Sequence, residues 1–233
     1  LHYKKTPVGI TWVELTSDYY GNITAYISDK KHVLGLVSEL KRKSYFDNKI
    51  MEIINVNQDD SIKIACYNFE LVPNIRQRMY LWLNEYRENN SLNHPFTFEL
   101  YTSKWHDWAA KLSVDAHKVS KDYVHYEEMK KSKNRLRLEK RVLNGVYGDI
   151  HQPSSLVIFF NNQPVGFCLV VKVKCWGYKE VPWVFDICID PSFHGQGIGK
   201  ALLSKMIEEI RSEKFEIMGL AVTLTNTYAI RLY

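Results

Sequence analysis

The sequence predicts an α/β (α+β) fold, in which a mixed twisted sheet is flanked by helices and is preceded by a smaller α+β unit. Two observations support this prediction. Residues 181–224 have the pattern strand, glycine-rich turn, helix and strand, which is a βαβ unit with parallel strands. Residues 155–174 have the pattern of an antiparallel hairpin around the turn at 161–164. A sheet with both kinds of pairing follows.

The first 94 residues are expected to form the smaller unit, because the polar stretch at 88–94 is typical of a linker. Hydrophobic periodicity predicts strands at 9–15, 23–27, 50–56 and 62–72, and helices at 33–45 and 74–87. No glycine motif occurs in this region, so the sequence assigns no chemistry to it.

The second unit, residues 95–233, follows a readable order. It is predicted to contain a strand at 96–102, helices at 105–119 and 127–143, hairpin strands at 155–161 and 165–174, a strand at 181–190, a helix from 198 and a strand at 219–224. Pro191 ends the strand before the glycine turn because it removes a backbone donor. The helix from 198 has apolar residues at three- and four-residue spacings, which predicts one buried face.

Three glycines stand at alternate positions in the turn before that helix. Gly195, Gly197 and Gly199 carry no side chains, so backbone N–H groups can converge on an anion at the positive end of the helix. A phosphate-bearing ligand suits this turn. The alternative is a turn that only lets the helix pack closely on the strand.

Two common nucleotide motifs fail at this turn. A dinucleotide fingerprint needs glycine where Lys200 stands, and a P-loop needs glycine at His194 and Ser or Thr at Ala201. The segment 194–199 instead resembles the acyl-CoA-binding motif Arg/Gln-x-x-Gly-x-Gly/Ala of the GCN5-related N-acetyltransferase (GNAT) superfamily. Only its first position departs from the motif.

This resemblance implies that acetyl-CoA is the co-substrate. The loop would hold its pyrophosphate through Gly195, Gln196, Gly197, Ile198, Gly199 and Lys200, and the backbone of Ile187, Cys188 and Ile189 would line its pantetheine. His194 replaces the motif's Arg or Gln. Histidine is cationic for only part of the time near neutral pH, so a side-chain contact with phosphate there would be weaker or pH-dependent.

The last residues resemble a second GNAT pattern, Asn-x-x-Ala-x-x-Leu-Tyr. By this resemblance Asn226 lies near the pantetheine and Tyr233 protonates the departing thiolate. A phenol with a pKa of about 10 is a suitable donor to a thiolate of similar basicity. The alternative for Tyr233 is packing. In the family a further part of the helix and two strands follow this tyrosine, so the C-terminal strands of the fold are expected to be missing from the sequence.

The general base is left open by the sequence. The positions where family members often place an acid or histidine are Trp183 and Phe185, which cannot accept a proton. These two suggest an aromatic-lined acceptor pocket instead. Asp186 would serve only if a β-bulge turned it toward the site, and Glu180 or a water chain are equally open.

Composition sets the remaining expectations. The net charge of +5 comes largely from one predicted helix, whose basic side chains are interpreted as a solvated face. No nucleic-acid motif and no run of eighteen uncharged apolar residues occurs, so neither nucleic-acid binding nor a membrane span is predicted, and a cytoplasmic protein is expected. The four cysteines lack metal-ligand spacing, which favours reduced buried thiols and no metal. A homodimer is left open.

Together these patterns predict an acetyltransferase that moves an acetyl group from acetyl-CoA to an amine, in a small molecule or a protein, by direct attack. A covalent mechanism is disfavoured because no Cys or Ser stands in a nucleophile motif. Two alternatives remain: an acyl-CoA-binding regulatory module without catalysis, and an aminoacyl or peptidyl transferase on a related fold. The first 94 residues are either a degenerate acetyltransferase-like half or an unrelated module.

Overall fold

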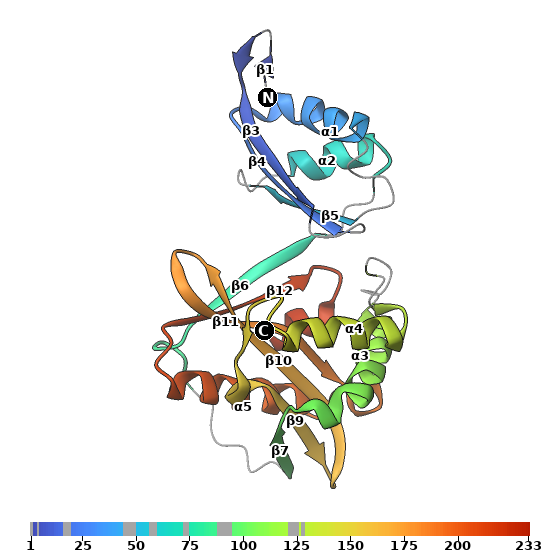
Figure 1. Ribbon diagram of the computed structural model, residues 1–233, viewed down its shortest axis with the longest axis vertical. Helices are drawn as coiled ribbons and strands as arrows, with labels where there is room; N and C mark the ends of the chain where they lie inside the picture. The colour runs from blue at the N-terminus through green and yellow to red at the C-terminus, as the bar shows by residue number, and fades with distance from the viewer. Residues whose placement is uncertain are drawn as a thin grey trace. The chain divides into compact units, whose positions relative to one another are not determined.

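The computed structural model describes the chain except for residues 1, 4, 16–19, 44–49, 56–59, 72–74, 88–94, 121–125 and 127–128. The chain divides into two compact units, Leu1–Asn74 and Ile75–Tyr233 (Figure 1). The boundary predicted after residue 94 therefore lies inside the second unit.

The first unit is a small sheet with two helices. Strand β3 (Gly9–Leu15) is antiparallel to β4 (Tyr20–Ile27), and β4 is parallel to β5 (Ile50–Asn55), with α1 (Val33–Arg42) between the two parallel strands. The short strands β1 (His2–Tyr3) and β2 (Thr6–Pro7), the 3-10 turn η1 (Lys30–His32) and helix α2 (Ser61–Asn68) complete the unit. The predicted strands at 9–15, 23–27 and 50–56 and the predicted helix at 33–45 are confirmed where the structure describes them. Residues 44–45 and 56, and the predicted linker at 88–94, lie outside the described residues.

Two predicted elements are wrong. Residues 62–72 were predicted as a strand, but Ser61–Asn68 is helix α2, whose buried residues Ile62, Ala65 and Cys66 share one helical face. Residues 74–87 were predicted as a helix, but Arg76–Trp82 is strand β6. In β6 every second side chain from Met79 packs inward, which is the alternation of a strand and not the spacing of a helix. Both segments are short apolar runs, for which periodicity separates helix from strand poorly.

The second unit contains a seven-stranded sheet in the order β6-β12-β11-β10-β9-β7, with β8 paired to β10. Its strands are β6, β7 (Phe96–Leu100), β8 (Asp149–Ile150), β9 (Leu156–Phe160), β10 (Gln163–Cys175), β11 (Tyr178–Ile189) and β12 (Ile217–Thr223). Its helices are α3 (His106–Ser120), α4 (Ser132–Leu143), α5 (Ile198–Ser212) and α6 (Thr227–Leu232), with 3-10 turns η2 (Ser103–Trp105), η5 (Gln152–Ser154) and η6 (Pro191–Phe193). Among the described strands of this sheet, only β11 and β12 pair in parallel, as the βαβ pattern predicted.

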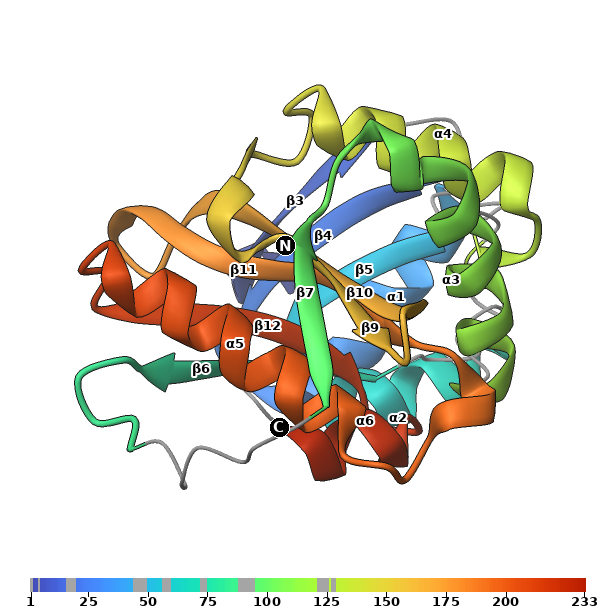
Figure 2. The same cartoon turned by 90° about the horizontal axis from the view of Figure 1, so that it is seen from below.

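Helices pack on both faces of this sheet. Along β10 the buried side chains alternate, with Cys168 and Val170 in the cluster that includes α5, and Phe167 and Leu169 in the cluster that includes α3. Figure 2 shows α5 crossing the sheet on the opposite side from α3 and α4. Strand β6 is antiparallel to β12 over its whole length, from Arg76 opposite Thr223 to Trp82 opposite Ile217. The edge of β12 is thereby covered.

Gly166 of β10 leaves no room for a side chain against β11. A Cβ built there would lie 2.8 Å from the backbone oxygen of Cys188 and 2.5 Å from Cδ1 of Ile189. We expect Gly166→Ala to lower the free energy of unfolding by about 1–3 kcal/mol, because the added methyl group overpacks the strand that borders the candidate site. Urea unfolding measures this change. Unchanged stability would show that the two strands separate without cost.

Candidate functional site

The glycine turn lies between η6 and α5. Gly195 and Gly197 have φ of +79° and +81°, in the left-handed region that glycine adopts without strain. Helix α5 begins after Gly197, and its first intrahelical bond runs from the Ala201 N–H to the Gly197 carbonyl, at 3.0 Å. The N–H groups of the preceding helical residues therefore lack intrahelical acceptors and form the positive end of a fifteen-residue helix. This end can bind an anion.

A pocket of about 300 Å³ opens beside this turn. Of the twelve site residues proposed from the sequence, it is lined by Ile187, Cys188, Ile189, His194, Gly195, Gly197, Ile198, Gly199, Lys200, Asn226 and Tyr233. Gln196 lies in the same turn but outside the lining. The structure thus brings together three segments that are separated in the sequence: the end of β11, the glycine turn with α5, and α6.

A β-bulge separates the last part of β11 from β12. Leu169 of β10 pairs with Asp186, but the next residue, Val170, pairs with Val184, so Phe185 is the extra residue. The parallel register with β12 covers only Trp183 and Val184. Beyond the bulge the backbone of β11 is not paired with β12, and this is the part that lines the pocket. Unpaired strand backbone can bind an extended, amide-containing ligand.

The His194 ring is hydrogen-bonded to the backbone of β11. Its Nε2 lies 3.1 Å from the carbonyl oxygen of Ile189, which can only accept, so Nε2 carries the proton. The ring also packs against Tyr228, with centroids 5.8 Å apart. In the neutral ring the remaining nitrogen has no proton to donate. A phosphate contact from His194 therefore requires the cationic form.

The C-terminal pattern falls on α6. Asn226 is the N-cap of this helix, and its Oδ1 accepts a hydrogen bond of 3.1 Å from the Ala229 N–H. This residue therefore has a structural function besides its position at the pocket. Tyr233 follows the helix, donates its backbone N–H to the Ala229 carbonyl at 3.0 Å, and packs partly buried against the core beneath α5. Both ends of the pattern lie at the pocket wall.

The open candidates for the base do not line this pocket. Glu180 is exposed, pairs with Lys172 at 3.1 Å, and stands seven residues before Ile187, roughly 23 Å along the strand. Asp186 is 8% exposed and points toward α3 and α4. The bulge that could have turned it is present, but it turns the side chain into a buried cluster.

The aromatic pair does not line the pocket either. Trp183 packs against the Trp176 ring, with centroids 5.5 Å apart, and lies over Gly219. Phe185 packs against Tyr147, with centroids 5.2 Å apart. The aromatic-lined acceptor pocket suggested by the sequence is therefore not part of the pocket described above.

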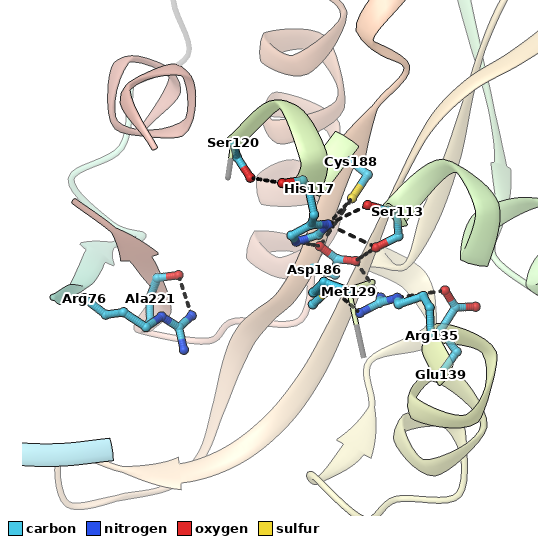
Figure 3. Close-up of polar contacts among 10 residues, drawn as sticks. All are labelled: Arg76, Ser113, His117, Ser120, Met129, Arg135, Glu139, Asp186, Cys188 and Ala221. Atoms are coloured by element: carbon cyan, nitrogen blue, oxygen red, sulfur yellow. Dashed lines mark hydrogen bonds and ion pairs between the residues drawn. The ribbon is translucent and has the colours of Figure 1, made fainter. Parts of the chain in front are cut away.

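The cluster around Asp186 is centred on a buried arginine (Figure 3). The Arg135 side chain is 0% exposed, and its guanidinium lies 2.5 Å from Asp186 Oδ2 and 3.2 Å from Glu139 Oε1. Glu139 also accepts a 2.7 Å hydrogen bond from the Tyr101 hydroxyl. The expectation of a solvated basic helix holds for Lys133, whereas Arg135 is the exception. The sequence contains a signal for this burial, because the residues of the buried face of α4 have helical spacing: Arg135, Leu138, Glu139 and Val142.

Burial and charge act in opposite directions on the two acids. Burial raises the pKa of Asp186, but the adjacent Arg135 and His117 outweigh this and hold it below its ordinary value. Burial raises the pKa of Glu139 to about 7, although Arg135 and Tyr101 favour its ionised form. Asp186 is therefore a fixed carboxylate and a weak proton acceptor.

Sequence reasoning missed His117. It lies in the last turns of α3, its side chain is 14% exposed, and it lines the pocket. Its Nδ1 is 2.7 Å from the carbonyl oxygen of Ser113 and its Nε2 is 3.9 Å from Asp186 Oδ1. Figure 3 shows Ser113, His117 and Cys188 gathered around the Asp186 carboxylate. Only the spacing of Ser113 and His117 by one helical turn hints at this in the sequence.

His117, Asp186 and Cys188 also form a group whose ligand atoms lie within 4.8 Å of one another, close enough to hold a metal ion. The positive charge of Arg135 already compensates Asp186. Burial raises the pKa of Cys188 well above its ordinary value, so its sulfur remains a thiol and donates to Asp186 at 3.4 Å. The contacts are those of a hydrogen-bonded cluster. All four cysteines are free, as predicted.

A glycine turn at the positive end of a helix, beside a strand whose backbone separates from its parallel neighbour, defines the fold of the GCN5-related N-acetyltransferases. Residues 115–233, half of the chain, match the profile of the Acetyltransferase (GNAT) family. The chain belongs to this family, whose co-substrate is acetyl-CoA.

Similar proteins agree with this assignment. The chain is 37% identical over 75 residues to an uncharacterized N-acetyltransferase of Methanocaldococcus jannaschii, covering 31% of this chain and 33% of the relative. It is 38% identical over 50 residues to the [ribosomal protein bS18]-alanine N-acetyltransferase of Escherichia coli K12, covering 22% and 34%. The matches span about a third of each relative.

Structural similarity extends over more of the chain. A GCN5-related N-acetyltransferase from Sphaerobacter thermophilus superposes with a TM-score of 0.61 at 12% identity, covering 91% of this chain and 67% of that one. At this identity the likeness concerns the fold alone. Among the described residues, no helix is long and apolar enough to cross a membrane.

Proposed function

We propose that this chain transfers the acetyl group of acetyl-CoA to an amine by direct attack. The observation that supports this best is the pocket where the glycine turn, Tyr233 and the end of β11 that is not paired with β12 meet. The N-acetyltransferase names of both relatives support an amine acceptor.

The residues fit the donor in parts. The N–H groups at the start of α5, with Gly195 to Lys200, would bind the pyrophosphate. The backbone of Ile187, Cys188 and Ile189 would bind the pantetheine, with Asn226 beside it. Tyr233 would protonate the sulfur as the thioester bond breaks. Gln196 does not line the pocket, so the contact that we propose for it is the weakest of the set.

Calorimetry with acetyl-CoA tests this proposal, and the chain offers a matched pair of variants. Gly197 and Gly177 both have positive φ, +81° and +84°, and a Cβ at either position meets nothing within 4 Å. Both alanine variants therefore carry a similar backbone strain of about 1–2 kcal/mol. We expect Gly197→Ala to weaken acetyl-CoA binding at least tenfold, about 1.4 kcal/mol, because its methyl group enters the anion site.

Gly177 lies in the turn between β10 and β11, so Gly177→Ala should bind acetyl-CoA as the wild type does. Equal affinity of all three proteins would place the binding site elsewhere. No binding of acetyl-CoA to the wild type, or no acetylation of any amine in a panel, would contradict the proposed function.

We further propose that residues 75–233 carry this activity and that the first unit is a degenerate copy of half of the same fold. In both units an antiparallel pair leads to a parallel pair through a helix: β3-β4-α1-β5 and β10-β11-α5-β12. The segment between β4 and α1, residues 28–32, contains no glycine. It therefore lacks the phosphate turn.

A further inference from the structure

We propose that His117 is the general base that takes the proton from the acceptor amine, and that Asp186 balances the charge that the ring then carries. This inference rests on the proposed acetyl transfer and assigns the residue that the sequence left open.

His117 lies where a base is needed. Among the described residues, it lines the same pocket as the end of β11, the glycine turn and Tyr233, and it enters from α3, whereas Tyr233 follows α6. A base and an acid from two different elements of one pocket can act on the attacking and the leaving group of the same transfer. Asp186 and Glu180 do not line this pocket.

The tautomer of His117 also suits a base. Nδ1 lies 2.7 Å from the carbonyl oxygen of Ser113, and a carbonyl only accepts, so Nδ1 carries the proton. In the neutral ring Nε2 therefore holds the lone pair. A fixed Nδ1–H leaves Nε2 as the nitrogen that gains a proton, which is what a general base requires.

A carboxylate lies close enough to balance the positive charge of a protonated His117. When Nε2 gains a proton, the nearest carboxylate oxygen is Asp186 Oδ1, at 3.9 Å. Arg135 and Ser113 bind the other oxygen, Oδ2, so Oδ1 faces the ring. A fixed carboxylate at this distance stabilises the imidazolium that forms, whereas the Ser113 carbonyl orients the neutral ring through Nδ1–H.

The reaction then balances as follows. The amine nitrogen bonds to the thioester carbonyl carbon while one N–H proton passes to Nε2 of His117. The C–S bond breaks, and the sulfur takes the hydroxyl proton of Tyr233. The products are the N-acetylated amine and the free CoA thiol, and solvent carries the proton from His117 back to the Tyr233 oxygen.

Other groups near the ring are less suited to this step. Burial keeps Cys188 a thiol. Besides Cys188, the titratable or charged groups that the structure describes around the ring and pocket are Asp186, Arg135, His194, Lys200, Tyr228 and Tyr233. The His194 ring donates to Ile189 at the far side of the glycine turn, and Lys200 is an exposed cation.

The experiment compares wild type, His117→Gln and His106→Gln, a control at the other end of α3. The assay uses acetyl-CoA and whichever of spermidine, lysine, kanamycin or an alanyl peptide the wild type acetylates fastest. We expect His117→Gln to lower kcat about 10²–10⁴-fold, with acetyl-CoA affinity changed less than twofold. The wild-type kcat should fall as the pH is lowered, because a protonated imidazole accepts no proton, and His117→Gln should lose this dependence.

Two further measurements separate a base from a structural residue. Added imidazole should restore part of the rate to His117→Ala, and nitrogen-15 NMR of the free protein should find the proton of His117 on Nδ1. An Nε2–H tautomer, or a kcat of His117→Gln within twofold of wild type, would overturn the base assignment while leaving acetyl transfer intact. A wild type that neither binds acetyl-CoA nor acetylates any of the amines would instead refute the proposed function.

Discussion

Replacing Arg135 with Met is expected to lower the free energy of unfolding by about 3–5 kcal/mol. Arg135 is fully buried and is the guanidinium shared by Asp186 and Glu139. Without it the buried Asp186 loses its guanidinium partner, and the desolvation cost of its charge is no longer offset. The loss is large because a partner is removed, whereas the intact pair itself adds little net stability.

Urea unfolding followed by circular dichroism measures the change. Arg137→Met is the matched control, because Arg137 is exposed on the same helix, and it should alter stability by no more than about 0.5 kcal/mol. Adding Asp186→Asn and Glu139→Gln to Arg135→Met should recover part of the loss, because the buried acids are then uncharged. Equal stability of Arg135→Met and Arg137→Met would show that Asp186 reaches water.

The spacing of Arg135 with Leu138 and Val142 shows that it lies on the buried face of α4, but its segment does not show which distant groups compensate its charge. Local sequence shows a helix rich in Lys and Arg, and the expected solvated face describes its exposed residues correctly. The partners of Arg135 come from β11 and, through Glu139, from Tyr101, which lies after β7. Only the packing of α4 against α3 and the sheet shows that this charge is compensated.

The parts of the fold that the sequence predicted well are those with a local signal. The parallel pair β11–β12 follows from a strand, a glycine turn and an amphipathic helix in succession. Strand β6 was misassigned because its place is set by a partner far along the chain, β12, which turns an ambiguous apolar run into a strand. The pairing of β6 with β12 also explains why the second unit begins at Ile75 and not after the predicted boundary at residue 94.

The candidate site also has parts with a local sequence signal and parts without one. The glycine turn and the segment ending at Tyr233 are contiguous motifs, and the structure gathers nearly all of their residues at one pocket. His117 belongs to no motif, and it reaches the pocket because α3 packs on the face of β11 where the bulge turns Asp186. A one-residue bulge reverses the side-chain alternation that follows it, so sequence spacing could not settle which acid faces which side.

Tyr233→Phe is expected to lower kcat about 10²–10⁴-fold while changing acetyl-CoA affinity less than twofold. Phenylalanine keeps the ring that packs against the core beneath α5, so the fold and the pocket wall are retained, and only the hydroxyl proton is lost. Without that proton the sulfur must leave as a thiolate or wait for a proton from water. Release of the CoA thiol, followed with a thiol reagent, measures kcat, and calorimetry measures the affinity.

Tyr67→Phe is the control for this change, because Tyr67 is an exposed tyrosine of α2 that belongs to neither of the two sequence motifs. It should leave both quantities unchanged. A Tyr233→Phe enzyme with wild-type kcat would remove the general-acid assignment, since water would then suffice as the proton source. Combining it with His117→Gln adds a second test: if base and acid act in one transfer, the double variant should lose less than the product of the two single losses.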